Sequence, residues 1–517
     1  MLYGTVKSTI EHFLIKLKLW HILLAAAGIY LAAAGSGLSV IGDDSLYVLI
    51  SRNFINGAFS PYFFSPSPPP YFVYYVLLPL LLVPFAAFAP QNFLLMKMVP
   101  FISSLLAIIA INEFLKGVTD NKKRKIVLIL FACNPWIVEY STRIMTELPF
   151  ILLSVCTLIA YNKYTEQQKA RYFAALVVFA GLSLYTRAFG FALIIAIVAI
   201  FAIRKKRREA LLAAIFFLII LAPILRSAPA LLRHFLKMMV IKQEYAAFDF
   251  KQISFLQLLW RMGYNFLAYV GNYVPDIFFK PILVDITPRL AARAINPLFL
   301  PKFTFGALLS AVALFGFIRT AGRKLQLAHA YVISHILLNL AINVYVARYI
   351  LSLLPLMLWF FFEGLGALEK RKKQLVNFSF VFLFTGSLLG SIGNIYVSRT
   401  GYLTPEVKAF IECNEWIKEK VPAGKIILSY NSIYTIVSSY RQAVIYILSE
   451  NIDDQIKYIR GNNIDYVLVS VPACAIDIKA VMLKTIWRYP DEFRLVYTSK
   501  IIPSSYVYAF KKTPNKK

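Results

Sequence analysis

The chain has 517 residues, of which 59% are hydrophobic and only 16% charged, and its mean hydropathy is +0.65. Soluble globular proteins are about half apolar and about a quarter charged. The composition therefore excludes an ordinary soluble enzyme and predicts a polytopic protein of the cell (plasma) membrane. The net charge of +29 would suit a nucleic-acid-binding protein, but the basic residues lie in short runs between apolar segments. Because a nucleic-acid interface needs a basic face on a polar domain, we expect no nucleic-acid partner.

Eleven apolar stretches follow one another up to residue 399, at 20–40, 71–89, 94–115, 126–140, 147–162, 172–203, 210–226, 302–318, 327–346, 349–366 and 375–397. About 20 helical residues cross the apolar core of a bilayer, so most of these stretches predict a membrane span. Basic clusters lie between them, at 122–125, 169–171, 204–208, 323–324 and 370–373. Under the positive-inside rule, we place these clusters and the N-terminus on the cytoplasmic side.

This placement fixes which stretches cross the membrane. The stretch 71–89 contains Pro79 and Pro84, which kink a helix, and its crossing would put the cluster at 122–125 outside. We expect it to be a re-entrant or surface-lying helix. The stretch 172–203 must form two helices broken around Arg187, since an arginine within a span is costly. Residues 1–399 are thus predicted to form an all-α polytopic membrane domain of about eleven transmembrane helices, with external loops 41–93 and 227–300.

The composition becomes that of an ordinary domain beyond residue 399. Its pattern predicts a small extracytoplasmic α/β domain over 400–517, with helices at 406–420 and 453–460 and strands at 425–430, 443–447, 466–471 and 506–510. Cys413 and Cys474 in this domain could form one disulfide or remain two free thiols. In the loop 227–300, basic and apolar residues at 233–242 predict an amphipathic stretch along the membrane interface.

Under this topology, four polar groups reach the outer face, and they contain Asp43, Asp44, Arg143, Glu147, Arg187, Arg348 and Tyr349. Arginine binds phosphate through paired hydrogen bonds, and a carboxylate can act as a general base toward a hydroxyl. Acidic residues at the membrane edge are expensive, so they indicate a functional site. Together the groups suit an anionic lipid headgroup beside a group that accepts a proton.

Each group also has a structural interpretation. Asp43 and Asp44 could be a solvated helix cap, and Arg143 and Glu147, four residues apart, could pair with each other. Arg187 and Arg348 could bind stray carbonyls or lipid headgroups. For His329 and His335, which are six residues apart, we expect core or structural roles and no shared metal.

Several motifs resemble the GT-C glycosyltransferases, most closely the dolichyl-phosphate-mannose protein mannosyltransferase-like family that includes the aminoarabinose transferase of lipid A. The first external loop of that family resembles the run from Gly42 to Tyr47, then Arg52 and Gly57, then Pro69-Pro70-Tyr71. The segments Asn134-Pro135, Thr146-Glu147-Leu148-Pro149, Tyr185-Thr186-Arg187 and Ala347-Arg348-Tyr349-Ile350 resemble later family motifs, in the same order. The resemblance covers nearly the whole chain.

The resemblance implies an inverting transfer, outside the cytoplasm, of mannose or a similar sugar from a polyprenyl-phosphate donor to a protein, lipid or glycan acceptor. Asp43, with Asp44 as the other candidate, would be the catalytic base, and Glu147 the second acid. Arg187, Arg348 and Tyr349 would bind the donor phosphate, while Arg143, Tyr47 and Arg52 would contact the acceptor or support the site. Some members of the family use Mg²⁺ or Mn²⁺, which Asp43 and Glu147 would hold here. The run 65–70 departs from the family pattern, so the acceptor does not follow.

Two other classes of function fit a polytopic chain. A transporter or lipid flippase would use the acids to couple protons, and it predicts acids deep within several spans. A non-catalytic assembly protein would use the outer domain to bind a partner. Against the transporter, predicted helices eight to eleven contain almost no acids before Glu363, and transport does not explain an outer α/β domain.

Overall fold

A computed structural model describes residue 12 and residues 14–40, 42–57, 75–227, 253–280, 299–342, 347–369, 375–400, 404–447, 449–470 and 476–511. The chain divides into two compact units. The first unit consists of Met1–Gly35, Tyr74–Leu78 and Lys97–Ser398, and the second of Ser36–Val73, Pro79–Met96 and Arg399–Lys517.

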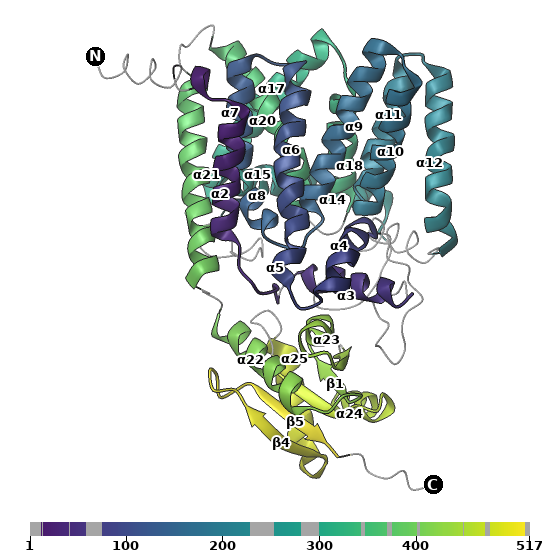
Figure 1. The fold of residues 1–517 in the computed structure, drawn as a ribbon, viewed down its shortest axis with the longest axis vertical. Helices are drawn as coiled ribbons and strands as arrows, with labels where there is room; N and C mark the ends of the chain where they lie inside the picture. The colour runs from purple at the N-terminus through teal and green to yellow at the C-terminus, as the bar shows by residue number, and fades with distance from the viewer. Residues whose placement is uncertain are drawn as a thin grey trace, which may run out of the picture. The chain divides into compact units, whose positions relative to one another are not determined.

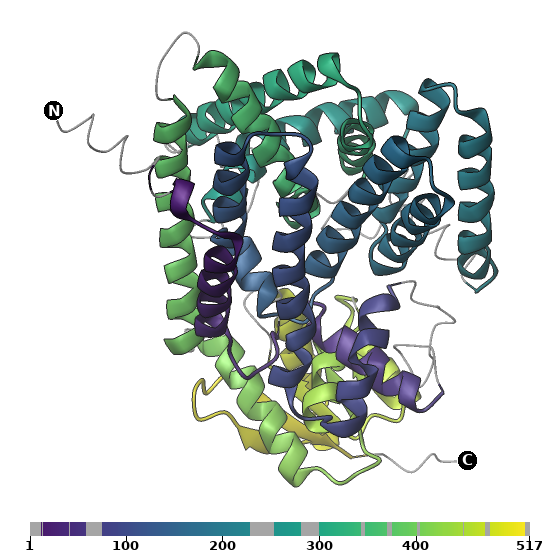
Figure 2. The same cartoon turned by 45° about the horizontal axis from the view of Figure 1, so that its top comes forward.

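The first unit is a helical bundle (Figure 1 and Figure 2). In chain order its described elements are α2 (Leu19–Ala33), α6 (Met98–Lys116), α7 (Asn121–Ala132), α8 (Pro135–Ser141), α9 (Glu147–Gln167), α10 (Ala170–Thr186), α11 (Gly190–Ile203), α12 (Arg207–Ser227), α14 (Phe255–Ala268), the π-helix η1 (Tyr269–Tyr273), α15 (Val274–Phe278), α17 (Phe299–Arg323), α18 (Leu327–Ala341), α19 (Ala347–Ile350), the 3₁₀-helix η2 (Leu351–Leu353), α20 (Leu354–Leu368) and α21 (Leu375–Thr400). Helix α9 packs between α6 and α10, and α17 packs against α20.

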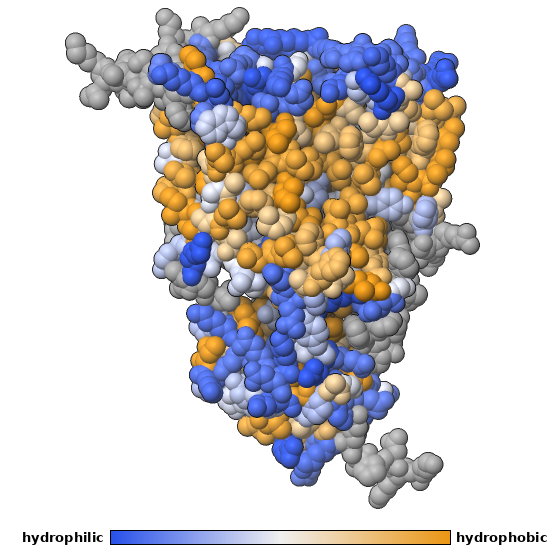
Figure 3. Space-filling model, in the orientation of Figure 1, coloured by the Kyte–Doolittle hydropathy of each residue, from blue (hydrophilic) through white to orange (hydrophobic). Residues whose placement is uncertain are grey.

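Among the described residues, five helices are long and apolar enough to cross a membrane: Phe93–Lys116, Glu147–Gln167, Leu300–Arg323, Ala347–Leu368 and Leu375–Arg399. Five shorter apolar helices accompany them. Figure 3 shows a broad band of apolar side chains across the visible face of this unit, with hydrophilic side chains gathered at its upper end. Such a band is what a helical protein in contact with lipid must expose.

Most of the basic clusters gather at one end of this bundle. Polar contacts join four of the five predicted clusters, and the fifth, at 370–373, lies outside the described residues. The joining contacts are Lys123 Nζ to Glu363 Oε1 (3.0 Å), Arg323 Nη1 to Glu363 Oε2 (4.0 Å), Arg204 Nη2 to the Leu325 carbonyl (2.5 Å) and Lys206 Nζ to Gln168 Oε1 (3.0 Å). The positive-inside rule predicts that this basic end faces the cytoplasm.

Two predicted segments differ from the structure. The stretch 126–140 is two helices, because Asn134 accepts hydrogen bonds from the Trp136 and Ile137 amides and Pro135 begins α8. The external loop 227–300 is helical over much of its described part, in α14, η1 and α15. The amphipathic stretch predicted at 233–242 lies outside the described residues. The break predicted around Arg187 is confirmed, since α10 ends at Thr186 and α11 begins at Gly190.

The second unit contains α3 (Asp44–Ile55), most of α4 (Leu77–Phe88) and α5 (Phe93–Met96), followed by α22 (Pro405–Lys420), β1 (Ile426–Ser429), α23 (Ser432–Ser439), β2 (Gln442–Ile445), α24 (Ile452–Gly461), β3 (Tyr466–Val469), α25 (Ile476–Arg488), the 3₁₀-helix η4 (Pro490–Glu492), β4 (Phe493–Thr498) and β5 (Tyr506–Phe510). Helix α4 has 12 residues, or about 18 Å at 1.5 Å per residue, which is shorter than a bilayer core.

The sheet of this unit has the order β2-β1-β3-β5-β4. Strands β2, β1 and β3 are parallel, while β5 is antiparallel to β3 and to β4. Leu428 pairs with Val444 on one side and Val467 on the other, and Val467 pairs with Tyr508. These strands and α24 and α25 enclose a buried apolar core. The predicted helices and strands of 400–517 are all present, and α23, α25 and β4 are additional to the prediction.

Candidate functional site: a buried acid–arginine pair and an acidic helix start

The break between α10 and α11 places Arg187 in an extended conformation (φ −155°, ψ 149°) at the end of α10. The chain turns back so tightly that a Cβ atom on Gly190 would lie 2.4 Å from the Cα and the nitrogen of Leu184. Only glycine fits this approach. The arginine is therefore held at a helix end by backbone geometry, at the end of α10 opposite to the basic loops.

Arg187 forms a buried ion pair with Glu147, the first residue of α9. Arg187 Nη1 lies 2.5 Å from Glu147 Oε1, and the two side chains are 12% and 2% exposed. Arg187 Nη1 also donates to Thr146 Oγ1 at 3.3 Å. The start of a helix favours a negative charge, which adds to the stabilisation of Glu147 by arginine. Glu147 Oε2 is buried and accepts no hydrogen bond from the described residues, so the carboxylate can still receive a donor from a ligand.

Arg348 and Tyr349 lie beside this pair. The guanidinium carbon of Arg187 is 6.0 Å from the centre of the Tyr349 ring, and that of Arg348 is 5.6 Å from the same ring centre. Phe189 packs on Tyr349 with 5.0 Å between ring centres. Two cations thus share one aromatic ring, an arrangement that stabilises guanidinium groups.

The two histidines have structural partners. His335 Nε2 lies 2.8 Å from the Tyr349 carbonyl and 3.2 Å from Ser352 Oγ. His329 Nε2 lies 3.0 Å from Thr320 Oγ1. His335 thus supports the backbone of Tyr349, and both imidazoles have protein partners, as a structural role requires.

Arg143 belongs to a second charged cluster, which includes two residues that the sequence did not indicate. Arg143 Nη1 contacts Glu139 Oε1 at 3.2 Å, and Lys280 Nζ contacts Glu139 Oε2 at 2.5 Å and Asn394 Oδ1 at 2.9 Å. Glu147 pairs with Arg187 and Arg143 pairs with Glu139, so the alternative in which Arg143 and Glu147 pair with each other is wrong.

The predicted acid pair lies at the start of α3, in the second unit. Asp43 occupies the N-cap position, but its carboxylate makes no capping hydrogen bond. Asp44 and Tyr47 are buried, with 1% and 4% of their surface exposed. Gly42, with φ of 134°, supplies a turn that other residues rarely adopt. Asp44 is therefore not a solvated group, and it carries a cost of burial that a functional acid can justify, whereas Asp43 is only half-buried.

Arg52, in the last turn of α3, is bound by the C-terminal part of the chain. It donates to the Val437 carbonyl at 3.1 Å, the Pro90 carbonyl at 2.6 Å and Tyr440 Oη at 3.1 Å. Burial lowers the pKa of Arg52, and Tyr440 opposes this shift. Of its two predicted roles, contacts of this kind favour support of the site.

Neither unit offers a ready set of metal ligands. Among the described residues, no three His, Cys, Asp or Glu side chains are grouped so that they could hold a metal ion. The expected use of Asp43 and Glu147 as metal ligands thus gains no support from the donor set, and we derive no catalytic step through Mg²⁺ or Mn²⁺. Cys413 is a buried free thiol, and Cys474 lies outside the described residues.

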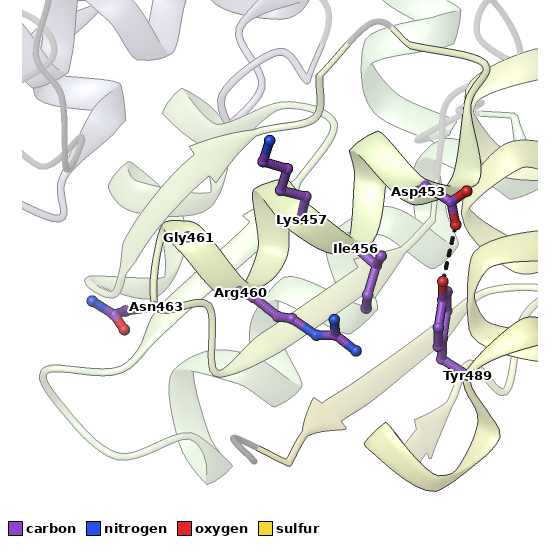
Figure 4. Close-up of a pocket in the computed structure, with 7 residues that line it drawn as sticks. All are labelled: Asp453, Ile456, Lys457, Arg460, Gly461, Asn463 and Tyr489. Carbon is purple, nitrogen blue, oxygen red and sulfur yellow. Dashed lines mark hydrogen bonds between the residues drawn. The ribbon is translucent and has the colours of Figure 1, made fainter. Parts of the chain in front are cut away.

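The second unit also has a surface pocket of about 700 Å³. Figure 4 shows Tyr489 reaching Asp453, with 3.0 Å between the phenol and carboxylate oxygens. None of the predicted site residues contributes to this pocket, which is lined by Asp453, Ile456, Lys457, Arg460, Gly461, Asn463 and Tyr489.

Known proteins resemble this chain in sequence over one segment and in fold over most of its length. The family model of the dolichyl-phosphate-mannose-protein mannosyltransferases matches residues 72–231. The crystal structure of ArnT from Cupriavidus metallidurans bound to undecaprenyl phosphate is similar with a TM-score of 0.56 and 11% identity, over 96% of this chain and 98% of that chain. AglB, the oligosaccharyltransferase of Archaeoglobus fulgidus, in complex with an inhibitory peptide and a dolichol-phosphate, is similar with a TM-score of 0.53 and 14% identity, over 96% and 74%.

Another structure of the Archaeoglobus fulgidus oligosaccharyltransferase, in complex with Zn and sulfate, has a TM-score of 0.52 and 16% identity over 86% of this chain and 67% of that chain. No curated protein sequence matches the chain significantly. At identities this low, the TM-scores show a shared fold and nothing beyond it. The family model confirms the resemblance to the dolichyl-phosphate-mannose protein mannosyltransferase family over residues 72–231, and the solved structures add the shared fold.

Proposed function

We propose that the chain is an integral-membrane, inverting glycosyltransferase that moves a sugar from a polyprenyl-phosphate donor to an acceptor hydroxyl on the extracytoplasmic face. The N-terminus and the basic loops would lie in the cytoplasm, and the C-terminal α/β domain outside. The observation that carries the proposal is the buried Glu147–Arg187 pair beside Arg348, at the end of α9 and α10 away from the basic loops.

The transfer needs one base and a stabilised leaving group. Asp43 takes the proton of the acceptor hydroxyl, the hydroxyl oxygen forms a bond to the anomeric carbon, and the bond from that carbon to the phosphate oxygen breaks. The bonding electrons leave with polyprenyl phosphate. Arg187 and Arg348 stabilise the negative charge that grows on this phosphate, which is the largest single contribution that a preorganised site can make.

Glu147 is assigned to the acceptor. Its Oε2 atom is buried with no hydrogen bond from the described residues, so a hydroxyl or amide of the acceptor can donate to it. Arg187 neutralises this carboxylate. A donor phosphate would compete for the same guanidinium, which couples donor binding to the availability of Glu147.

The proposal is tested by supplying membranes that contain the protein with polyprenyl-phosphate-linked mannose, and with other hexoses and pentoses on the same lipid. We expect one of these donors to be consumed, with release of polyprenyl phosphate and a sugar on the acceptor in the inverted anomeric configuration. A transporter or flippase would instead move the intact lipid between leaflets without breaking the sugar–phosphate bond. Movement without cleavage, or cleavage equal to that of membranes lacking the protein, would contradict the proposal.

A further inference from the structure

Helix α23 of the C-terminal region holds α3 at both ends. Near the start of α3, Asn431 Nδ2 donates to the Val40 carbonyl at 2.7 Å, while Asn431 Oδ1 accepts the Tyr434 amide at 3.0 Å and so caps α23. Near the end of α3, Arg52 donates to the Val437 carbonyl, in the last turn of α23. All of these residues belong to the second unit, in which α3 and α23 lie side by side (Figure 1).

The two attachments hold α3 at separate points. On the α23 side, Asn431 and Val437 are six residues apart, or about 9 Å at 1.5 Å per residue. On α3, Asp44 and Arg52 are eight residues apart, or about 12 Å. Asn431, which precedes α23, thus holds the chain just before α3, and the long Arg52 side chain connects the last turn of α3 to the last turn of α23.

Arg52 joins the carboxyl ends of three helices. It lies in the last turn of α3, the Val437 carbonyl belongs to the last turn of α23, and the Pro90 carbonyl follows the end of α4. The guanidinium carbon also lies 4.7 Å from the centre of the Tyr440 ring. Because each helix end carries unpaired carbonyls and partial negative charge, a single half-buried cation stabilises all three ends together.

We propose that the C-terminal domain takes part in the transfer reaction by positioning the acid pair, with Asn431 and Arg52 as positioning residues. The inference rests on the proposed function, in which Asp43 is the base. Asp43 and Asp44 lie directly between Val40, which Asn431 holds, and the body of α3, which Arg52 holds. A shift of about 1 Å in such a group can cost about 100-fold in rate, so losing either attachment should slow transfer without removing any group that touches the substrate.

The test is Asn431→Asp in the full-length protein. The new carboxylate can still cap α23, because aspartate is as good an N-cap as asparagine, but it cannot donate to the Val40 carbonyl. The matched control is Asn451→Asp, since Asn451 caps α24 in the same way, by accepting the Asp453 amide at 2.9 Å. A second variant, Arg52→Lys, keeps the charge but loses the planar group that reaches several acceptors.

For Asn431→Asp and Arg52→Lys we expect kcat to fall about tenfold or more, with the KM for the lipid-linked donor changed less than about twofold. Hydrogen exchange of the α3 amides should become faster in both variants, while the midpoint of thermal unfolding of Asn431→Asp stays that of Asn451→Asp. Transfer by Asn431→Asp at the rate of Asn451→Asp, or unchanged exchange in α3, would overturn the inference. If the wild type and Asn451→Asp both fail to transfer any sugar, the proposed function fails instead, and the exchange measurement still decides whether α23 holds α3.

Discussion

Removing one partner of the Glu147–Arg187 pair should destabilise the protein, and replacing both should not. The 2% exposed carboxylate of Glu147 lies 2.5 Å from Arg187, so Arg187→Met would leave a buried charge with its closest cation gone. Such a loss typically costs about 3–5 kcal/mol. Glu147→Leu together with Arg187→Met replaces the pair by apolar groups of similar size, a change that is often neutral or stabilising by about 1–4 kcal/mol.

The assay compares thermal unfolding midpoints in one detergent for both single variants, the double variant and Arg171→Met. Arg171 is an exposed arginine on the same helix, α10, and its loss should change stability by less than about 0.5 kcal/mol. The single variants should unfold at clearly lower temperatures, while the double variant should unfold near the wild type.

Transfer activity then separates stability from function. We expect the double variant to be folded but inactive, and to bind radiolabelled polyprenyl phosphate weakly, because Arg187 is assigned to the donor phosphate. A double variant that transfers sugar at the wild-type rate would show that the pair is only structural. An Arg187→Met protein as stable as Arg171→Met would refute the reasoning about the buried charge.

Three further predictions concern the break, the topology and the C-terminal domain. Gly190→Ala should lower the unfolding midpoint and transfer, because its Cβ atom would overlap the backbone of the preceding turn, whereas Gly28→Ala, which has nothing within 4 Å of a Cβ atom, should leave both unchanged. With the native cysteines replaced by alanine, an impermeant maleimide added to intact cells should label Lys420→Cys but not Lys122→Cys; the reverse pattern would contradict the proposed orientation. Burial alone would raise the pKa of Glu412, but hydrogen bonds from two hydroxyls and a backbone amide outweigh burial and hold this pKa below its usual value. The ionised Glu412 therefore stabilises the fold above the pKa that it has in the unfolded chain, and this stabilisation is lost as the pH falls through its folded pKa. Glu412→Gln should thus lose less stability in acid than the wild type. Identical acid unfolding curves for the two proteins would contradict this prediction.

Part of the membrane unit could be predicted from simple costs. An arginine inside a long apolar run is too expensive to leave in a continuous span, and this argument located the break at Arg187. The break at Asn134 was not predicted, although an N-cap residue followed by proline is a known helix start. The apolar residues on both sides of Asn134 outweighed that local signal in the prediction.

The partners of the charged groups could not be predicted, because they come from distant parts of the sequence. Arg143 has an acid four residues away in each direction, Glu139 and Glu147, and spacing alone cannot choose between them. The structure places Glu139 with Arg143 and also with Lys280, which is 141 residues further along. Glu147 begins a new helix and meets Arg187 from the end of another.

In the C-terminal domain, strong patterns were found and weaker ones were missed. The amphipathic helix at 406–420 and the apolar strands were recognised, whereas the short helix α23 was not. Its eight residues lack the long periodic pattern on which recognition depends. The support that α23 gives to α3 follows from contacts such as Asn431 to Val40, 391 residues apart, and no local pattern indicates them.

The most direct test of the account is sugar transfer by the variant in which Asp43 and Asp44 are both replaced by asparagine. We expect this variant to insert into membranes and to unfold like the wild type. It should still bind polyprenyl phosphate through Arg187 and Arg348, but it should transfer no sugar. Transfer at the wild-type rate by the double asparagine variant would contradict the central claim that a carboxylate at the start of α3 is the base.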